Sequence, residues 1–82
     1  MNVMQAQAID LPTATDEDLR GAWNALAGRI SSEHVEHGLQ ACAADTHVFC
    51  FQATEREMKR RGLPRPSGNY VLTAHDRIAW LA

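Results

Sequence analysis

Between residues 15 and 30, apolar side chains recur at steps of four, three and four. They are Leu19, Trp23, Leu26 and Ile30. This spacing is typical of one face of an amphipathic helix, because 3.6 residues make one turn. Thr15 is followed three residues later by Asp18, a variant of the capping box, and the acidic residues at 16–18 suit the positive end of a helix dipole. We therefore expect a helix that begins just after Thr15.

The periodicity changes after this first stripe. Val35 and Leu39 do not lie on the same helix face as this stripe. The serine pair at 31–32 offers a new N-cap and is followed by a glutamate. The pattern predicts a break or kink at the serine pair. It also predicts a second helix over residues 33–43, with Val35, Leu39 and Cys42 facing inward.

A third helix is predicted to begin at a cap formed by Asp45 or Thr46. Its inward face contains Val48, Phe51 and Met58, which share one side at helical spacing. Its end is marked by a basic last turn, a glycine and a proline, namely Lys59, Arg60, Arg61, Gly62 and Pro64.

The last part of the chain begins with a loop over residues 63–68, which contain two prolines and a glycine. Beyond it, four side chains lie at steps of four, four and three: Tyr70, Ala74, Ile78 and Leu81. Because Thr73 and Asp76 offer another cap, we expect a fourth helix here. A short strand at residues 70–72 is the competing interpretation, but it would lack a visible partner for its backbone groups.

Residues 1–12 mix glutamine, alanine and methionine without a clear period and end at a proline. We interpret them as a flexible N-terminal arm, followed by a single helical domain over residues 13–82. The 82-residue chain is 45% hydrophobic and 22% charged, which is typical of one small globular domain. Its apolar positions are largely alanine and leucine, which favour helix packing. The predicted fold class is all-α, a small bundle of three to four short helices.

Charge is unevenly distributed along the chain, although the formal net charge is only −2. Residues 1–45 carry a net charge of −5, and residues 46–82 carry +3. This asymmetry indicates either oppositely charged helices packed side by side or a basic face for an acidic partner. No stretch reaches the roughly 20 apolar residues of a membrane span, and the N-terminus lacks the features of a secretory signal. We therefore expect a cytoplasmic protein without a membrane partner.

Histidines and cysteines gather in the middle of the chain, at His34, His37, Cys42, His47 and Cys50. Their spacings suit zinc ligands, but a helical hairpin turning near residue 45 would offset His37 from His47 by roughly 9 Å along the axis. Cys42, His47 and Cys50 can converge near the turn only with a fourth ligand such as His75. We instead interpret the cysteines as buried thiols beside surface histidines, and we assign no metal and no cofactor.

The sequence shows no catalytic signature. Ser31, Ser32 and Ser67 lie at predicted caps or loops, and His75-Asp76 opens a predicted helix, where an aspartate is expected for capping. The glycines are scattered singly, so they form no phosphate-binding loop. We predict a protein that is not an enzyme.

Two surface features are candidates for partner binding. One is a basic run, which also complements the dipole at a helix C-terminus: Arg56, Lys59, Arg60, Arg61 and Arg65. The other is a pair of aromatic side chains, Phe49 and Trp80, which we expect to project outward as interface anchors.

Two short segments resemble parts of many small accessory proteins from phages and prophages of GC-rich bacteria. They are Thr15-Asp-Glu-Asp-Leu19, which opens a predicted helix, and Glu57-Met-Lys-Arg-Arg-Gly-Leu-Pro64, which closes another. The resemblance implies a short cytoplasmic protein that binds a host macromolecule, as phage inhibitors of defence systems or of transcription do. No functional residue carries over from it.

The leading functional hypothesis is a small non-catalytic protein–protein interaction module, a phage-type inhibitor or regulator that binds a host protein complex. The expected partner is a host or cognate protein, and a homodimer is a further possibility. The alternative is a small helix-turn-helix-like DNA-binding regulator built from the second and third helices. The acidic total charge and the apolar opening His47-Val48-Phe49 of the third helix make nucleic acid the less favoured partner.

Overall fold

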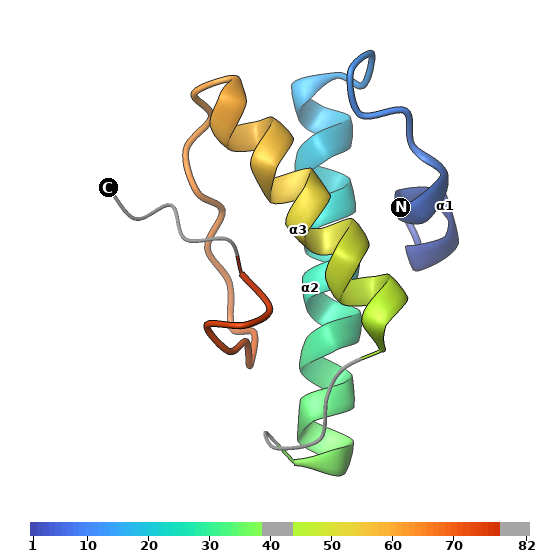
Figure 1. Cartoon of the computed structure of the whole chain (residues 1–82), viewed down its shortest axis with the longest axis vertical. Coiled ribbons are helices and arrows are strands. Elements are labelled where there is room, and N and C mark those ends of the chain that lie inside the picture. The colour runs from blue at the N-terminus through green and yellow to red at the C-terminus, as the bar shows by residue number, and fades with distance from the viewer. Residues whose placement is uncertain (39–43, 78–82) are drawn as a thin grey trace.

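The computed structural model describes residues 1–38 and 44–77. Within these ranges the chain forms three helices and no strand: α1 (Val3–Ala8), α2 (Asp16–His37) and α3 (Asp45–Arg60). Helices α2 and α3 pack against each other, α1 lies on one side of them, and the segment after α3 runs along the other side (Figure 1). The predicted all-α class is confirmed for the described part of the chain.

The first half of α2 forms as its pattern predicts. The hydroxyl of Thr15 accepts a hydrogen bond from the backbone N–H of Asp18 at 3.0 Å, which caps the helix. The whole apolar stripe is buried, comprising Leu19, Trp23, Leu26 and Ile30. Trp23 packs on Phe51 of α3 with a ring-centroid distance of 5.4 Å, so the contact between α2 and α3 forms the centre of the core.

Of the break or kink predicted at the serine pair, the break is wrong, because α2 continues through residues 31–32 to His37 as one helix. The buried face passes from Ile30 to His34, one turn further on, and leaves Val35 70% exposed. A polar residue therefore continues the stripe that apolar residues begin. Gly38, with a φ of 88°, ends the helix in a backbone conformation that side chains other than glycine rarely adopt. The inward positions predicted for Leu39 and Cys42 lie outside the described residues.

Helix α3 agrees with its predicted inward face and with its predicted end. Val48, Phe51 and Met58 are all buried. At the C-terminus, the N–H of Leu63 donates to the carbonyl of Met58 and the N–H of Gly62 to that of Lys59, both at 3.0 Å. Together with a φ of 74° at Gly62, these bonds form a Schellman motif. At the other end Ala44 occupies the N-cap, and no side chain caps the helix.

Residues 3–8 of the segment interpreted as a flexible arm form α1. The side chain of Asn2 accepts from the N–H of Gln5, and the side chain of Gln5 accepts from the N–H of Asn2, a reciprocal capping box. A helix of six residues is too short to be stable alone, so packing must hold it. Ala6 is buried in the core, and the partly buried side chains of Val3, Ile9 and Leu11 pack against the same core.

After α3, residues 63–77 cross back over α2 and α3 without helix or strand. The ring of Tyr70 meets Trp23 edge-on, and the N–H of Val71 donates to the hydroxyl of Ser31. The predicted cap contacts between Thr73 and Asp76 form, but they close a turn and not a helix within the described residues. The strand considered at residues 70–72 is absent, and the remainder of the predicted fourth helix, including Ile78 and Leu81, lies outside the described residues.

Candidate functional site

An apolar groove lies between the N-terminal region and α3. Its volume is about 160 Å³, and it opens to solvent. Ala6, Ile9 and Leu11 form one wall, and Phe49, Cys50 and Ala53 of α3 form the other. The groove therefore lies where residues 6–11 meet the N-terminal half of α3.

Phe49 stands at this groove with 69% of its surface exposed. The expected outward projection of this side chain is therefore found. Cys50, the free cysteine in the described part of the chain, lies half-buried in the same wall. Trp80, the second predicted anchor, lies outside the described residues. An exposed phenyl ring beside an apolar groove is the arrangement that the described structure offers for binding another apolar side chain.

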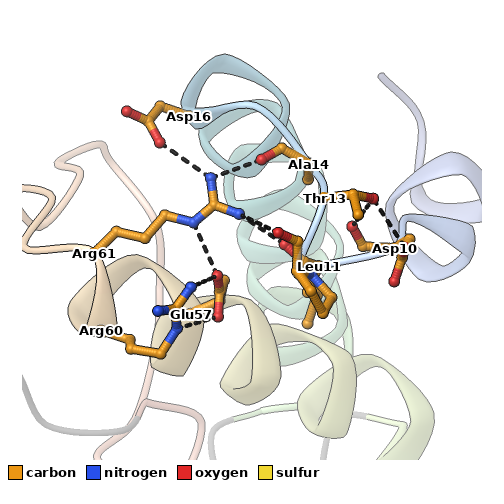
Figure 2. Close-up of polar contacts among 9 residues, drawn as sticks. Asp10, Leu11, Thr13, Ala14, Asp16, Glu57, Arg60 and Arg61 are labelled. Carbon is orange, nitrogen blue, oxygen red and sulfur yellow. Dashed lines mark hydrogen bonds and ion pairs between the residues drawn. The ribbon is translucent and has the colours of Figure 1, made fainter.

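One member of the predicted basic run, Arg61, turns inward and is not part of an exposed cationic surface (Figure 2). Its guanidinium donates to Glu57 at 2.8 Å and pairs with Asp16 at 3.1 Å. It also donates to three backbone carbonyls in the link between α1 and α2, those of Leu11, Pro12 and Ala14. Arg61 therefore joins the end of α3 to the start of α2.

Glu57 lies between two arginines. Hydrogen bonds from Arg60 and Arg61, together with their charges, lower the pKa of this carboxyl to about 2. The Arg60 side chain makes this contact on the surface, where 67% of it is exposed, whereas only 18% of Arg61 is exposed. Neighbouring arginines thus have different surroundings, one outward and one enclosed.

The outward face of α3 combines charge with the groove wall. Asp45, Phe49, Ala53, Arg56 and Arg60 follow at steps of four, four, three and four, which places them on one side of a helix. The first of these is acidic and the last two are basic. Of the remaining predicted cations, Lys59 lies off this line, and Arg65 is exposed in the segment after α3.

Two buried polar features lie under the segment 63–77. His34 of α2 is joined to Asp76, and the same carboxylate accepts from the N–H of Thr73 at 2.8 Å. Glu55 of α3 is 1% exposed, and within the described structure neither of its carboxylate oxygens has a hydrogen-bond partner. Burial raises the pKa of Glu55 to about 7, against the opposing charge of Arg65.

The histidine and cysteine cluster is dispersed in the described structure. His47 contacts Glu33, which also accepts from the backbone N–H of Ala44, while His37 lies on the surface. Burial raises the pKa of Glu33, but the bonds from Ala44 and His47 outweigh it and lower the pKa. Over residues 1–38 and 44–77, no three histidine, cysteine or acidic side chains are placed to hold a metal ion. Cys42 lies outside these ranges.

Sequence reasoning missed the N-terminal wall of the groove and the buried acids. Ile9 and Leu11 were assigned to an arm because they carry no helical period. A signal did exist for Glu55, which lies four residues after Phe51 and three before Met58 and so occupies a core position. No comparable local signal links His34 to Asp76.

Comparisons with protein-family models, with curated proteins and with solved structures give no match to this chain. No helix in the described part of the chain combines the length and the apolar character needed to cross a membrane. The groove and the face of α3 therefore have to be interpreted from their own chemistry.

Proposed function

We propose that this protein is a small non-catalytic interaction module that binds another protein through the groove between α1 and α3. The observation that supports this proposal most directly is the exposed Phe49 side chain beside an open apolar groove of about 160 Å³. The biological role that we propose is that of a phage-type inhibitor or regulator acting on a host protein complex. The cytoplasm is the corresponding proposed location.

The energetics of such a site favour a few central contacts. Full burial of a phenylalanine side chain contributes about 1.5–3 kcal/mol, and aromatic anchors of this kind dominate many interfaces. A partner helix can lay an apolar side chain into the groove while Phe49 packs against its flank. Arg56, which follows on the same face of α3, favours a partner segment with an acidic residue beside its apolar anchor.

The DNA-binding alternative has no specific observation in its favour among the described residues. Its first helix, expected over residues 33–43, is partly contained in the long helix α2. Two of its expected phosphate contacts, Arg60 and Arg61, bind Glu57. A DNA-binding protein of this kind would bind duplex DNA at low salt and lose that binding as the salt concentration rises. DNA binding by this chain stays a prediction.

Site-specific photocrosslinking tests the proposed function. A photoreactive phenylalanine analogue replaces Phe49 in one variant and Val35 in another, since both side chains are about 70% exposed. In lysate of the organism that encodes the chain, we expect a defined protein to crosslink from position 49 and not from position 35. The identified protein is then purified and titrated, and Phe49→Ala should weaken its binding by about tenfold or more.

Equal crosslinking from positions 35 and 49, or binding of the purified partner that is unchanged by Phe49→Ala, would overturn this proposal. Circular dichroism of each variant checks that α2 and α3 remain folded.

A further inference from the structure

We propose that a second copy of this chain can occupy the groove, so that two copies pair through the outward face of α3 about a two-fold axis. The inference rests on the proposed function only in taking this groove to be a binding surface. Its occupant is named from features of this chain alone, because the same face carries both an exposed anchor and a site that can receive it.

A symmetric pair requires a self-complementary surface, since each residue of the patch meets the same patch on the other copy. The face of α3 meets this condition in its charges. Asp45 lies at the beginning of the helix, and Arg56 lies toward its end. An antiparallel pair sets acid against base twice, whereas a parallel pair would set acid against acid and base against base.

The apolar groups select the same register. A two-fold axis that sets Asp45 opposite Arg56 passes midway between them, at the level of residues 50–51. This axis lies about 8 Å along the helix from each of the two residues, at 1.5 Å rise per residue. It also sets Phe49 opposite Gln52, next to Ala53 of the groove wall. One axis therefore pairs the charges and brings each phenyl ring to the partner's groove.

The dimensions of the groove suit this occupant. An apolar cavity of about 150 Å³ is large enough to bind benzene, and the groove measures about 160 Å³. It can therefore accept one phenyl ring from the second copy. Ala53, close to the axis, has a small side chain that lets the two helices approach. Two reciprocal Phe49 insertions would bury the most exposed aromatic side chain of the described structure.

Self-association and foreign-partner binding would then compete for one surface. A foreign partner with higher affinity would displace the second copy, and dilution would release the groove by mass action.

Sedimentation equilibrium of the full chain, from low micromolar to near-millimolar concentration, tests the pairing. We expect the mass to rise from one chain to two, and Phe49→Ala to raise the dissociation constant by about tenfold or more. Val35→Ala, an equally exposed apolar position on α2, is the matched control and should leave the constant unchanged. A mass of one chain at every concentration overturns the proposal, as does an equal effect of the two substitutions.

Charge reversal tests the register. Asp45→Arg and Arg56→Asp should each weaken the dimer, and the double variant should restore it, because the pairs reform with reversed sign. Failure of the double variant to recover, with each variant shown to be helical by circular dichroism, overturns the antiparallel arrangement.

The outcomes separate this inference from the proposed function. A monomeric chain whose position 49 still crosslinks a foreign protein removes the dimer and retains the interaction module. A chain that dimerises, but whose position 49 crosslinks no foreign protein, retains the dimer and removes the proposed interaction module.

Discussion

The imidazole Nε2 of His34 lies 2.8 Å from Oδ2 of Asp76, and the two side chains are only 3% and 2% exposed. This contact joins the last turns of α2 to a segment 42 residues further along the chain. Because the carboxylate also accepts from the N–H of Thr73, it fixes the turn at residues 73–76. The pair thus holds residues 63–77 against the core, and its enclosure keeps it away from any external ligand.

Removal of one member of this pair should be costly. We expect His34→Ala to lower the free energy of unfolding by about 3 kcal/mol, because it leaves the Asp76 carboxylate buried without its main partner. Denaturant unfolding measures this change. His37→Ala, which truncates a histidine on the surface of the same helix, is the matched control and should cost less than about 0.5 kcal/mol. Similar losses from the two substitutions would contradict the buried contact.

Detachment of the segment should also be visible locally. In His34→Ala, the amide of Val71, which donates to Ser31 in the native protein, should exchange its hydrogen faster, while amides in the first half of α2 keep their protection. Uniformly faster exchange would indicate global destabilisation without release of the segment.

Arg61 should contribute more to stability than its neighbour Arg60. Arg61→Ala removes contacts to two carboxylates and three backbone carbonyls, so we expect the melting temperature to fall by at least about 5 °C. Arg60→Ala removes a surface pair only and should lower the melting temperature by no more than about 2 °C. Thermal denaturation, monitored by circular dichroism, compares the melting temperatures of the two variants. A larger effect of Arg60→Ala would contradict the enclosed position of Arg61.

Glu55 should make the protein less stable as pH rises. The pKa of its carboxyl is about 7 in the folded chain, above the ordinary value of 4.5, so folding favours the protonated form. The resulting stability is fully present below pH 4.5 and is lost as pH rises from 4.5 to about 7. We expect Glu55→Gln to flatten the fall in melting temperature over this range.

The control for this experiment is Glu36→Gln, which removes one negative charge from an exposed position on α2. Below pH 4.5 the loss of the Glu57 contacts acts in the opposite direction, because the pKa of that carboxyl is lowered to about 2. The comparison is therefore made above pH 4.5. A wild-type profile that is flat, or one that Glu36→Gln flattens equally, would contradict the prediction.

Ser32→Ala separates a continuous α2 from a helix that restarts at the serine pair. Inside a helix, an exposed serine is less favourable than alanine, so the substitution should raise the free energy of unfolding by about 0.5 kcal/mol. At an N-cap it would instead lower that free energy by about 1 kcal/mol. Denaturant unfolding gives the sign directly, and a loss of stability would contradict the continuous helix.

The sequence by itself determined those elements whose signals lie within a few residues. The start of α2 at Thr15 and the end of α3 at Gly62 follow from hydrogen bonds between near neighbours, and both were predicted. The buried stripe of α2 and the inward face of α3 follow from helical periodicity, which indicates the apolar side chains that share the face toward the core. Phe49 was expected to project outward, and its side chain is 69% exposed.

Tertiary structure alone decided the positions where burial depends on a distant partner. His34 enters the core because Asp76 meets it, Arg61 turns inward because the link between α1 and α2 offers it carbonyls, and α1 is held by packing on α2. The local sequence around a polar side chain or a short helix does not indicate which distant residues will contact it. The groove beside Phe49 likewise forms only where the fold brings residues 6–11 next to α3. The desolvation of a charged group is compensated only when residues some 40 to 50 positions away are brought against it.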